Sequence, residues 1–162
     1  MAGGTRRLAP VQTWARWSLV ALAGASALTG CTRTVALPDP SPAASDLATC
    51  VRLMSALPDR VLDAERRFVT PGQLSAAWGK PVITLRCGVV KPPSLGDASQ
   101  CFEVNGVGWF AEQGTGGYLF TTIGRSTYVE VGVPSAYAPE ANALVDLAAA
   151  VSANDPLVKP CV

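Results

Sequence analysis

Residues 101–133, CFEVNGVGWFAEQGTGGYLFTTIGRSTYVEVGV, alternate apolar and polar side chains with a period close to two. Such alternation is typical of strands that bury one face. It predicts four strands, at residues 102–104, 107–111, 118–123 and 128–133. Asn105-Gly106 between the first two strands is a strong signal for a tight hairpin, and residues 114–117 and 124–127 contain the glycines for the other turns. Connections this short predict an antiparallel meander.

Two amphipathic helices are predicted on either side of these strands. Ser45 or Asp46 caps the first helix, whose apolar residues recur at intervals of three and four, at Leu47, Cys50, Val51, Met54 and Leu57. A last helix opens at Pro139-Glu140 and closes near Asn154, with one apolar stripe made of Ala141, Leu144, Val145, Ala148 and Val151.

The sequence between the first helix and the meander is less regular. Residues 61–69 predict a turn leading into a short strand, and residues 75–79 one helical turn that ends at Gly79. The β-branched residues in 82–87 predict another strand. Together these elements predict an α+β domain in which an antiparallel sheet of about five strands carries helices packed on one face.

The first 30 residues have the pattern of a lipoprotein signal peptide. Arg6, Arg7 and Arg16 are followed by an uncharged stretch, 17–30, which is shorter than the roughly 20 residues that a membrane-spanning helix needs. Leu28-Thr29-Gly30-Cys31 resembles the lipobox of bacterial lipoproteins, where a peptidase cuts before the cysteine. By that resemblance Cys31 becomes the first mature residue and carries a diacylglycerol. An ordinary secretory signal is the alternative.

Residues 31–45 predict a tether, because Pro38, Pro40 and Pro42 alternate with Ser, Ala and Asp and favour extended conformations. The single α+β domain is then expected at 46–162. Losing residues 1–30 leaves ten basic and twelve acidic residues, so the net charge changes from +1 to −2. The mature domain is thus mildly acidic, and the near-zero charge of the whole chain argues against a nucleic-acid partner, which would require a strong basic excess.

Four cysteines remain after such processing, an even number that predicts disulfides in an exported domain. Cys50, Cys87, Cys101 and Cys161 allow three pairings. We favour Cys87 with Cys101, because the Pro- and Gly-rich segment between them can turn the chain back, and Cys50 with Cys161. The cysteine spacings and the absence of histidine argue against a zinc site, and we expect no metal and no cofactor.

The absence of histidine also excludes imidazole-dependent catalysis. Glu103, Glu112 and Glu130 fall in the strand region, where paired carboxylates could act as acid and base in glycoside cleavage. Isolated glutamates on the solvent face of a sheet are ordinary, however. We therefore assign no catalytic residue and expect a protein that is not an enzyme.

Four other residues are candidates for contact with a partner. Trp78, Arg86, Trp109 and Arg125 belong to the residue types that dominate interface hot spots, and arginine can hold a carboxylate or phosphate through two hydrogen bonds. The alternative is that both tryptophans fill the core and that Arg125 pairs with Glu130 or an adjacent carboxylate.

An ordered set of short motifs resembles one known family. The motifs are Trp78-Gly79, Leu85-Arg86-Cys87-Gly88-Val89, Val104-Asn105-Gly106-Val107 with Trp109, Thr121 to Arg125, and Tyr128-Val129-Glu130-Val131 with Pro134. They are similar to the actinobacterial envelope family called domain of unknown function 3515. The resemblance implies a small exported protein or lipoprotein and no assigned reaction.

The sequence thus predicts a lipid-anchored protein on the outer face of the cytoplasmic membrane. We expect it to bind another envelope component, a membrane protein or an anionic wall polymer, near Arg86 or Arg125. A cell-wall hydrolase or transferase that uses Glu or Asp is the first alternative. A purely structural lipoprotein is the second.

Overall fold

The structure is a computed structural model that describes residues 1, 3–4 and 34–161. The chain divides into two units, Met1–Gly30 and Cys31–Val162. Most of the predicted signal peptide, and Cys31 as its predicted lipidation site, lie outside the described residues. All of the described helices and strands lie in the second unit.

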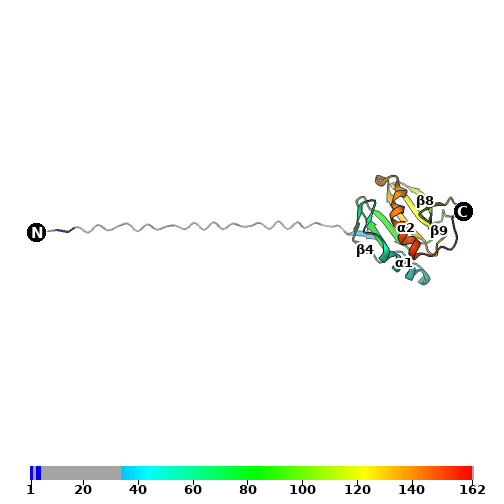
Figure 1. The fold of residues 1–162 in the computed structure, drawn as a ribbon, viewed down its shortest axis with the longest axis horizontal. Coiled ribbons are helices and arrows are strands. Elements are labelled where there is room, and N and C mark those ends of the chain that lie inside the picture. The colour runs from blue at the N-terminus through cyan, green and yellow to red at the C-terminus, as the bar shows by residue number, and fades with distance from the viewer. Residues whose placement is uncertain (2, 5–33, 162) are drawn as a thin grey trace. The chain divides into compact units, whose positions relative to one another are not determined.

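An eight-stranded antiparallel sheet forms the centre of this unit (Figure 1). Its strand order is β2 (Arg60–Val61), β3 (Ala64–Arg67), β5 (Ser75–Trp78), β6 (Ile83–Cys87), β10 (Val129–Pro134), β9 (Gly117–Ile123), β8 (Val107–Gly114) and β7 (Phe102–Val104). The predicted meander is confirmed as β7 to β10. The α+β class is also confirmed, but the sheet is larger than the five strands expected.

Part of that difference comes from residues 75–79, where the prediction of a helical turn is wrong. Ser75–Trp78 forms β5, which pairs with β3 on one side and β6 on the other, and all four of its side chains are buried. Burial between two strands outweighs the helix preference of its alanines. The chain then turns at Gly79, whose φ is +69° and where a Cβ would overlap the hydroxyl of Tyr137.

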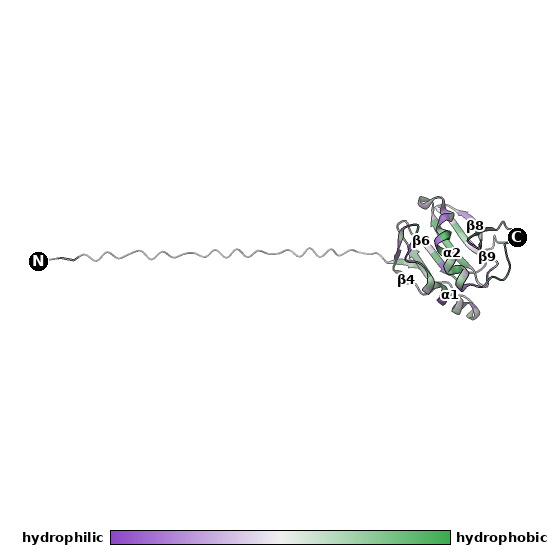
Figure 2. Cartoon of the chain, viewed as in Figure 1, coloured by the Kyte–Doolittle hydropathy of each residue, from purple (hydrophilic) through white to green (hydrophobic). Residues whose placement is uncertain are grey.

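Helices α1 (Ala44–Ala56) and α2 (Ala143–Asn154) pack against each other on one face of the sheet (Figure 1). Two short 3-10 turns, η1 (Ser135–Tyr137) and η2 (Glu140–Asn142), precede α2. The sheet contributes alternate side chains to the core between these layers, for example Val129, Val131 and Val133 of β10. Figure 2 shows the apolar character of α2 where it lies across the strands.

The first helix differs from its prediction at its start and in its buried stripe. It begins at Ala44, and neither Ser45 nor Asp46 caps it, because the N-cap position is Ala43 and has no side-chain hydrogen bond. The buried residues are Thr49, Cys50, Leu53 and Met54, followed by Leu57, whereas Leu47 and Val51 are 47% and 55% exposed. The burial of Cys50 is confirmed.

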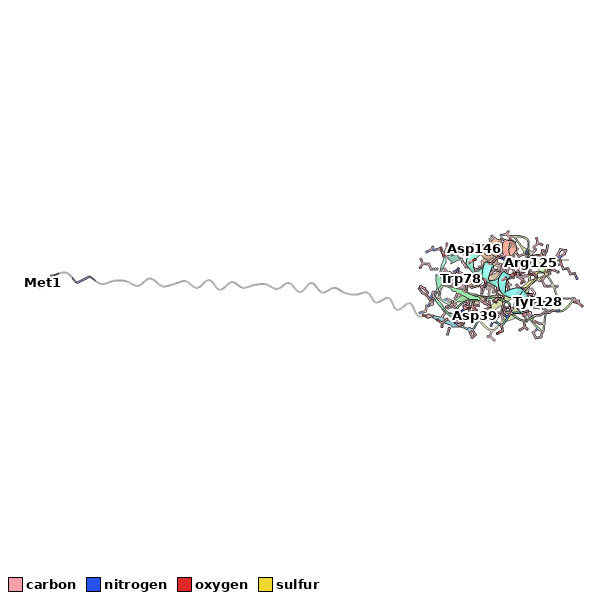
Figure 3. All side chains as sticks on the ribbon, turned by 90° about the horizontal axis from the view of Figure 1, so that it is seen from below. Met1, Asp39, Trp78, Arg125, Tyr128 and Asp146 are labelled. Carbon is pink, nitrogen blue, oxygen red and sulfur yellow. A yellow bond between two sulfur atoms is a disulfide. The ribbon has the colours of Figure 1, made fainter. Side chains whose placement is uncertain are left out.

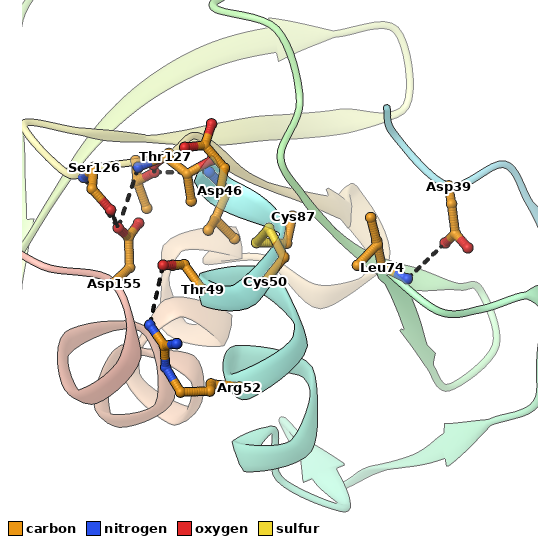
Figure 4. Close-up of a disulfide and its surroundings, with 12 residues drawn as sticks. Asp39, Asp46, Thr49, Cys50, Arg52, Leu74, Cys87, Ser126, Thr127 and Asp155 are labelled. Carbon is orange, nitrogen blue, oxygen red and sulfur yellow. Dashed lines mark hydrogen bonds between the residues drawn. A yellow bond between two sulfur atoms is a disulfide. The ribbon is translucent and has the colours of Figure 1, made fainter. Parts of the chain in front are cut away.

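The segment predicted as a tether is partly folded against the domain. Strand β1 (Val35–Leu37) pairs in parallel with β4 (Val69–Pro71) in a separate small sheet. The Asp39 carboxylate then accepts hydrogen bonds from the amides of Gln73 at 2.9 Å and Leu74 at 3.0 Å; Figure 4 shows the bond to Leu74. The prediction of a free spacer is therefore wrong for residues 35–45, because backbone pairing and the Asp39 carboxylate hold this segment against the domain.

Both disulfides are present, but the favoured pairing is wrong. Cys50 joins Cys87 with a Cα–Cα distance of 5.4 Å, and Cys101 joins Cys161 at 5.8 Å. Strands β10, β9 and β8 stand between β6 and β7, so Cys87 and Cys101 are four strand positions apart, about 19 Å at 4.8 Å per strand. This separation is too large for a disulfide. Figure 4 shows Cys50 of α1 bonded to Cys87 at the end of β6.

Candidate functional site

Both candidate tryptophans lie in the core. Trp78 and Trp109 are 0% exposed. The Trp78 indole donates a hydrogen bond from Nε1 to the Pro58 carbonyl at 3.0 Å, and the Arg66 guanidinium lies 5.7 Å from the centre of its ring. Trp109 Nε1 has no hydrogen-bond partner among the described residues. Neither indole is available to a partner at the surface, so their assignment as contact residues is replaced by the core interpretation.

Arg86 is engaged by a carboxylate on the face of the sheet opposite the helices. It donates from Nε at 2.9 Å and from Nη2 at 2.6 Å to Glu130 Oε1. The two side chains are 35% and 15% exposed. Glu130 faces Arg86 across the β6–β10 pair, so the alternative pairing of Glu130 with Arg125 is wrong. A ligand at Arg86 would have to compete with this ion pair.

Arg125 instead links its own turn to two other segments of backbone by hydrogen bonds. It donates from Nη1 to the carbonyl of Asp155 at 2.8 Å and from Nη2 to the carbonyl of Gly106 at 2.6 Å. The neighbouring Gly124 carbonyl accepts from the amides of Val158 at 2.8 Å and Lys159 at 2.9 Å. A Cβ on Gly124 would overlap the Lys159 carbonyl, which explains the glycine at this close approach. These contacts hold the C-terminal segment, residues 156–161, against the β9–β10 turn.

A buried carboxylate that the sequence analysis missed supports the same turn. Asp155 Oδ1 accepts hydrogen bonds from Ser126 Oγ at 2.6 Å, Ser126 N at 3.1 Å and Thr127 N at 3.2 Å (Figure 4). Burial raises the pKa of the Asp155 carboxyl, while these hydrogen bonds and the charge of Arg125 act in the opposite direction. The only signal in the sequence was an acidic residue directly after a helix, which also occurs in solvated turns.

A cavity of about 300 Å³ lies between the C-terminal segment and the β6–β7 loop, residues 88–101. Four of its lining residues carry charge: three are cationic, Lys91, Arg125 and Lys159, and one is acidic, Asp97. Figure 3 labels Arg125 and Tyr128, which belong to this lining.

Packing and a disulfide hold the two walls of the cavity. Leu95 anchors the loop as a buried side chain, and Ser94 Oγ donates to the carboxylate of Glu112. The Cys101–Cys161 disulfide joins the loop to the C-terminal segment. It packs over Gly108, where a Cβ would come within 3.1 Å of Cys101 Sγ.

The chemistry of this cavity suits an anionic group. Lys91 projects from one wall and Lys159 from the other, and both residues are exposed. Ammonium groups on flexible stems can donate hydrogen bonds to phosphate or carboxylate oxygens. Arg125, which the sequence analysis identified, adds positive charge to the lining while its guanidinium donates hydrogen bonds to two backbone carbonyls.

Two of the three glutamates considered for acid–base catalysis have hydrogen-bond donors elsewhere, and the third, Glu103, is an exposed residue of β7. Glu112 accepts from Ser94 and Glu130 from Arg86, and strand β9 lies between their strands. Within residues 34–161 we find no group of three or more Cys, Asp or Glu that could hold a metal ion. In the same part of the chain, no helix is long and apolar enough to cross a bilayer.

Comparison with known proteins gives one match. Residues 15–159 match the family model described as protein of unknown function (DUF3515). No curated protein and no solved structure matches the chain.

Proposed function

The chain belongs to the DUF3515 family, and we propose that this member is a lipid-anchored envelope protein that binds an anionic envelope polymer. The polymer would present phosphate or carboxylate groups to the cavity between the β6–β7 loop and the C-terminal segment. The protein would act on the outer face of the cytoplasmic membrane.

The anchor in this proposal is the lipid on Cys31. A basic n-region, an uncharged stretch and small residues before the cysteine support it. Two or three acyl chains give stable membrane attachment where a single chain gives only reversible binding. The Cys31→Ala variant should lose both the lipid mass and retention in the membrane fraction, and a variant that keeps both would overturn the anchor.

The observation that carries the binding proposal is the charge of the cavity. Its lining holds three cationic side chains against one acidic side chain, whereas residues 31–162 as a whole carry a net charge of −2. Positive charge gathered in a concave site of an otherwise acidic domain raises the local concentration of an anionic ligand. The two exposed lysines come from opposite walls, so an anionic group in the cavity has positive charge on both sides.

Three lysines in the described chain allow a matched experiment. Lys91 and Lys159 line the cavity, while Lys80 lies in the exposed β5–β6 turn outside it. Each lysine about 4 Å from an anion contributes about 1 kcal/mol in water. The Lys91→Gln/Lys159→Gln variant should therefore bind a poly(glycerol phosphate) probe, or polygalacturonate as the carboxylate probe, about 30-fold more weakly at low salt.

The Lys80→Gln variant should bind each probe as the wild type does. A free-energy loss in Lys80→Gln about half as large as in the double variant, equal per charge removed, would show that binding depends on overall charge and not on the cavity. Absence of binding by the wild type would leave the purely structural lipoprotein as the better interpretation. Release of low-mass fragments from either polymer would instead support the hydrolase alternative.

A further inference from the structure

One aromatic side chain is exposed where the predicted anchor meets the folded domain. Phe68 is 77% exposed, and no other aromatic residue in 34–161 belongs to the exposed class. It lies between β3 and β4. Full burial of a phenylalanine side chain stabilises by about 1.5 to 3 kcal/mol, so a surface that covers this ring would gain free energy of that order.

The strand register places this ring beside the start of the described chain. The Val35 amide donates to the Phe68 carbonyl at 2.8 Å, and the parallel pairing matches Val35 with Val69. Continuing this register by one residue sets Thr34 next to Phe68. The segment that leads back toward Cys31 therefore starts at the position of the exposed ring.

The folding of the predicted tether limits how far Cys31 can lie from this ring. Only four residue steps separate Cys31 from Val35. A fully extended chain spans at most about 3.6 Å per residue, so the two Cα atoms are within about 14 Å. A lipid on Cys31 would thus hold this edge of the domain at the bilayer, whereas a free spacer of 15 residues would let the domain move away from it.

We propose that Phe68 and the β1–β4 edge form a membrane-contact surface that rests on the lipid headgroups. This inference depends on the lipid anchor of the proposed function. Aromatic and large apolar side chains favour the boundary between headgroups and acyl chains. The anchor and the ring together orient the domain on the membrane.

The experiment compares two surface positions in the same chain. Phe68→Trp places an indole at the proposed contact, and Val90→Trp places one at a side chain that is 90% exposed in the β6–β7 loop. The mature chain, residues 31–162, is attached through the Cys31 thiol to a maleimide lipid in vesicles of phosphatidylcholine and phosphatidylglycerol with brominated acyl chains. The other four cysteines are in disulfides and do not compete.

Bromine should quench the indole of Phe68→Trp at least twofold more than that of Val90→Trp. The native indoles of Trp78 and Trp109 are buried and give the same background in both variants. Equal quenching, or none, would overturn the contact surface. So would emission from Phe68→Trp that changes with protein density in vesicles without bromine, because that result indicates contact between copies of the chain.

Attachment by chemical coupling separates this inference from the natural lipid modification. Absence of lipid on Cys31 of the chain from cells would overturn the anchor in the proposed function. Absence of quenching from the chemically attached chain would overturn the contact surface even if the natural lipid is present.

Discussion

Removing each disulfide in turn should have unequal effects on stability. The Cys50–Cys87 bond closes a sequence separation of 37 residues, and Cys101–Cys161 closes 60. In the chain-entropy model these loops correspond to about 3.8 and about 4.3 kcal/mol at 25 °C. Loop length alone therefore predicts a slightly larger loss for the second bond.

Burial reverses that order. Cys50 and Cys87 are completely buried between α1 and the sheet, whereas Cys101 and Cys161 are partly exposed. Replacing the first pair by alanine also removes two packed sulfur atoms and leaves a cavity, which adds about 2 kcal/mol. We expect a loss of about 6 kcal/mol for Cys50→Ala/Cys87→Ala and about 4 kcal/mol for Cys101→Ala/Cys161→Ala.

Guanidinium denaturation followed by far-ultraviolet circular dichroism measures both losses. If the total stability is near the lower end of the usual range of about 5 to 15 kcal/mol, the domain should be close to unfolding without the first bond and still folded without the second. In a graded thiol titration, Cys101–Cys161 should be reduced first because it is more accessible. An equal or larger loss for the Cys101→Ala/Cys161→Ala variant would refute the argument from burial, and a peptide map joining Cys87 to Cys101 would refute the connectivity.

Three further predictions test individual side chains. Burial raises the pKa of Asp155, so the folded chain binds this proton more tightly than the unfolded chain does. The tighter binding stabilises the fold fully below about pH 3.9, the unfolded-state pKa, and this stabilisation is lost as pH rises through the folded-state pKa. Thermal denaturation should show the wild type losing stability relative to Asp155→Asn as pH rises, and a constant difference would contradict the assignment. In urea denaturation, Trp78→Phe should lower the free energy of unfolding by about 1 kcal/mol more than Trp109→Phe does. Only Trp78 donates a hydrogen bond to a described residue, Pro58, and equal losses would count against this reasoning. Asp39→Ala should lower the free energy of unfolding by about 2 kcal/mol and speed hydrogen exchange at the two amides it accepts from, and unchanged exchange would show that the N-terminal segment is not held by this carboxylate.

The sequence predicted the meander well because its signals are local. Asn105-Gly106 and the period of two act within a few residues, and the strands that they predict are present within two or three residues at their ends. β5 was missed for the opposite reason. Its alanines favour a helix locally, and they form a strand only because they pair with β3 and β6. These pairings are not visible in the local sequence of residues 75–78.

Disulfide pairing and the cavity depend on strand order, which a single sequence does not reveal. Inserting β10 next to β6 separates Cys87 from Cys101. The C-terminal segment, hydrogen-bonded to the Gly124 carbonyl, places Cys161 beside Cys101 instead. The cavity likewise combines Lys91 with Lys159, which are 68 positions apart in the sequence. Arg125 was identified from its residue type, but its contacts with two backbone carbonyls could be seen only in the fold.

The β6–β7 loop has both of its ends fixed by different disulfides. Cys87, just before the loop, is bonded to α1, and Cys101, its last residue, is bonded to the C-terminal segment. Changes in the exposed residues of this loop therefore need not disturb the sheet, provided that Gly88, packed against Pro42, and the buried Leu95 are kept. This is the arrangement of an exchangeable surface loop on a rigid framework: if the cavity binds the polymer proposed above, grafting a new loop that keeps Gly88 and Leu95 should change the ligand preference while the rest of the domain is kept.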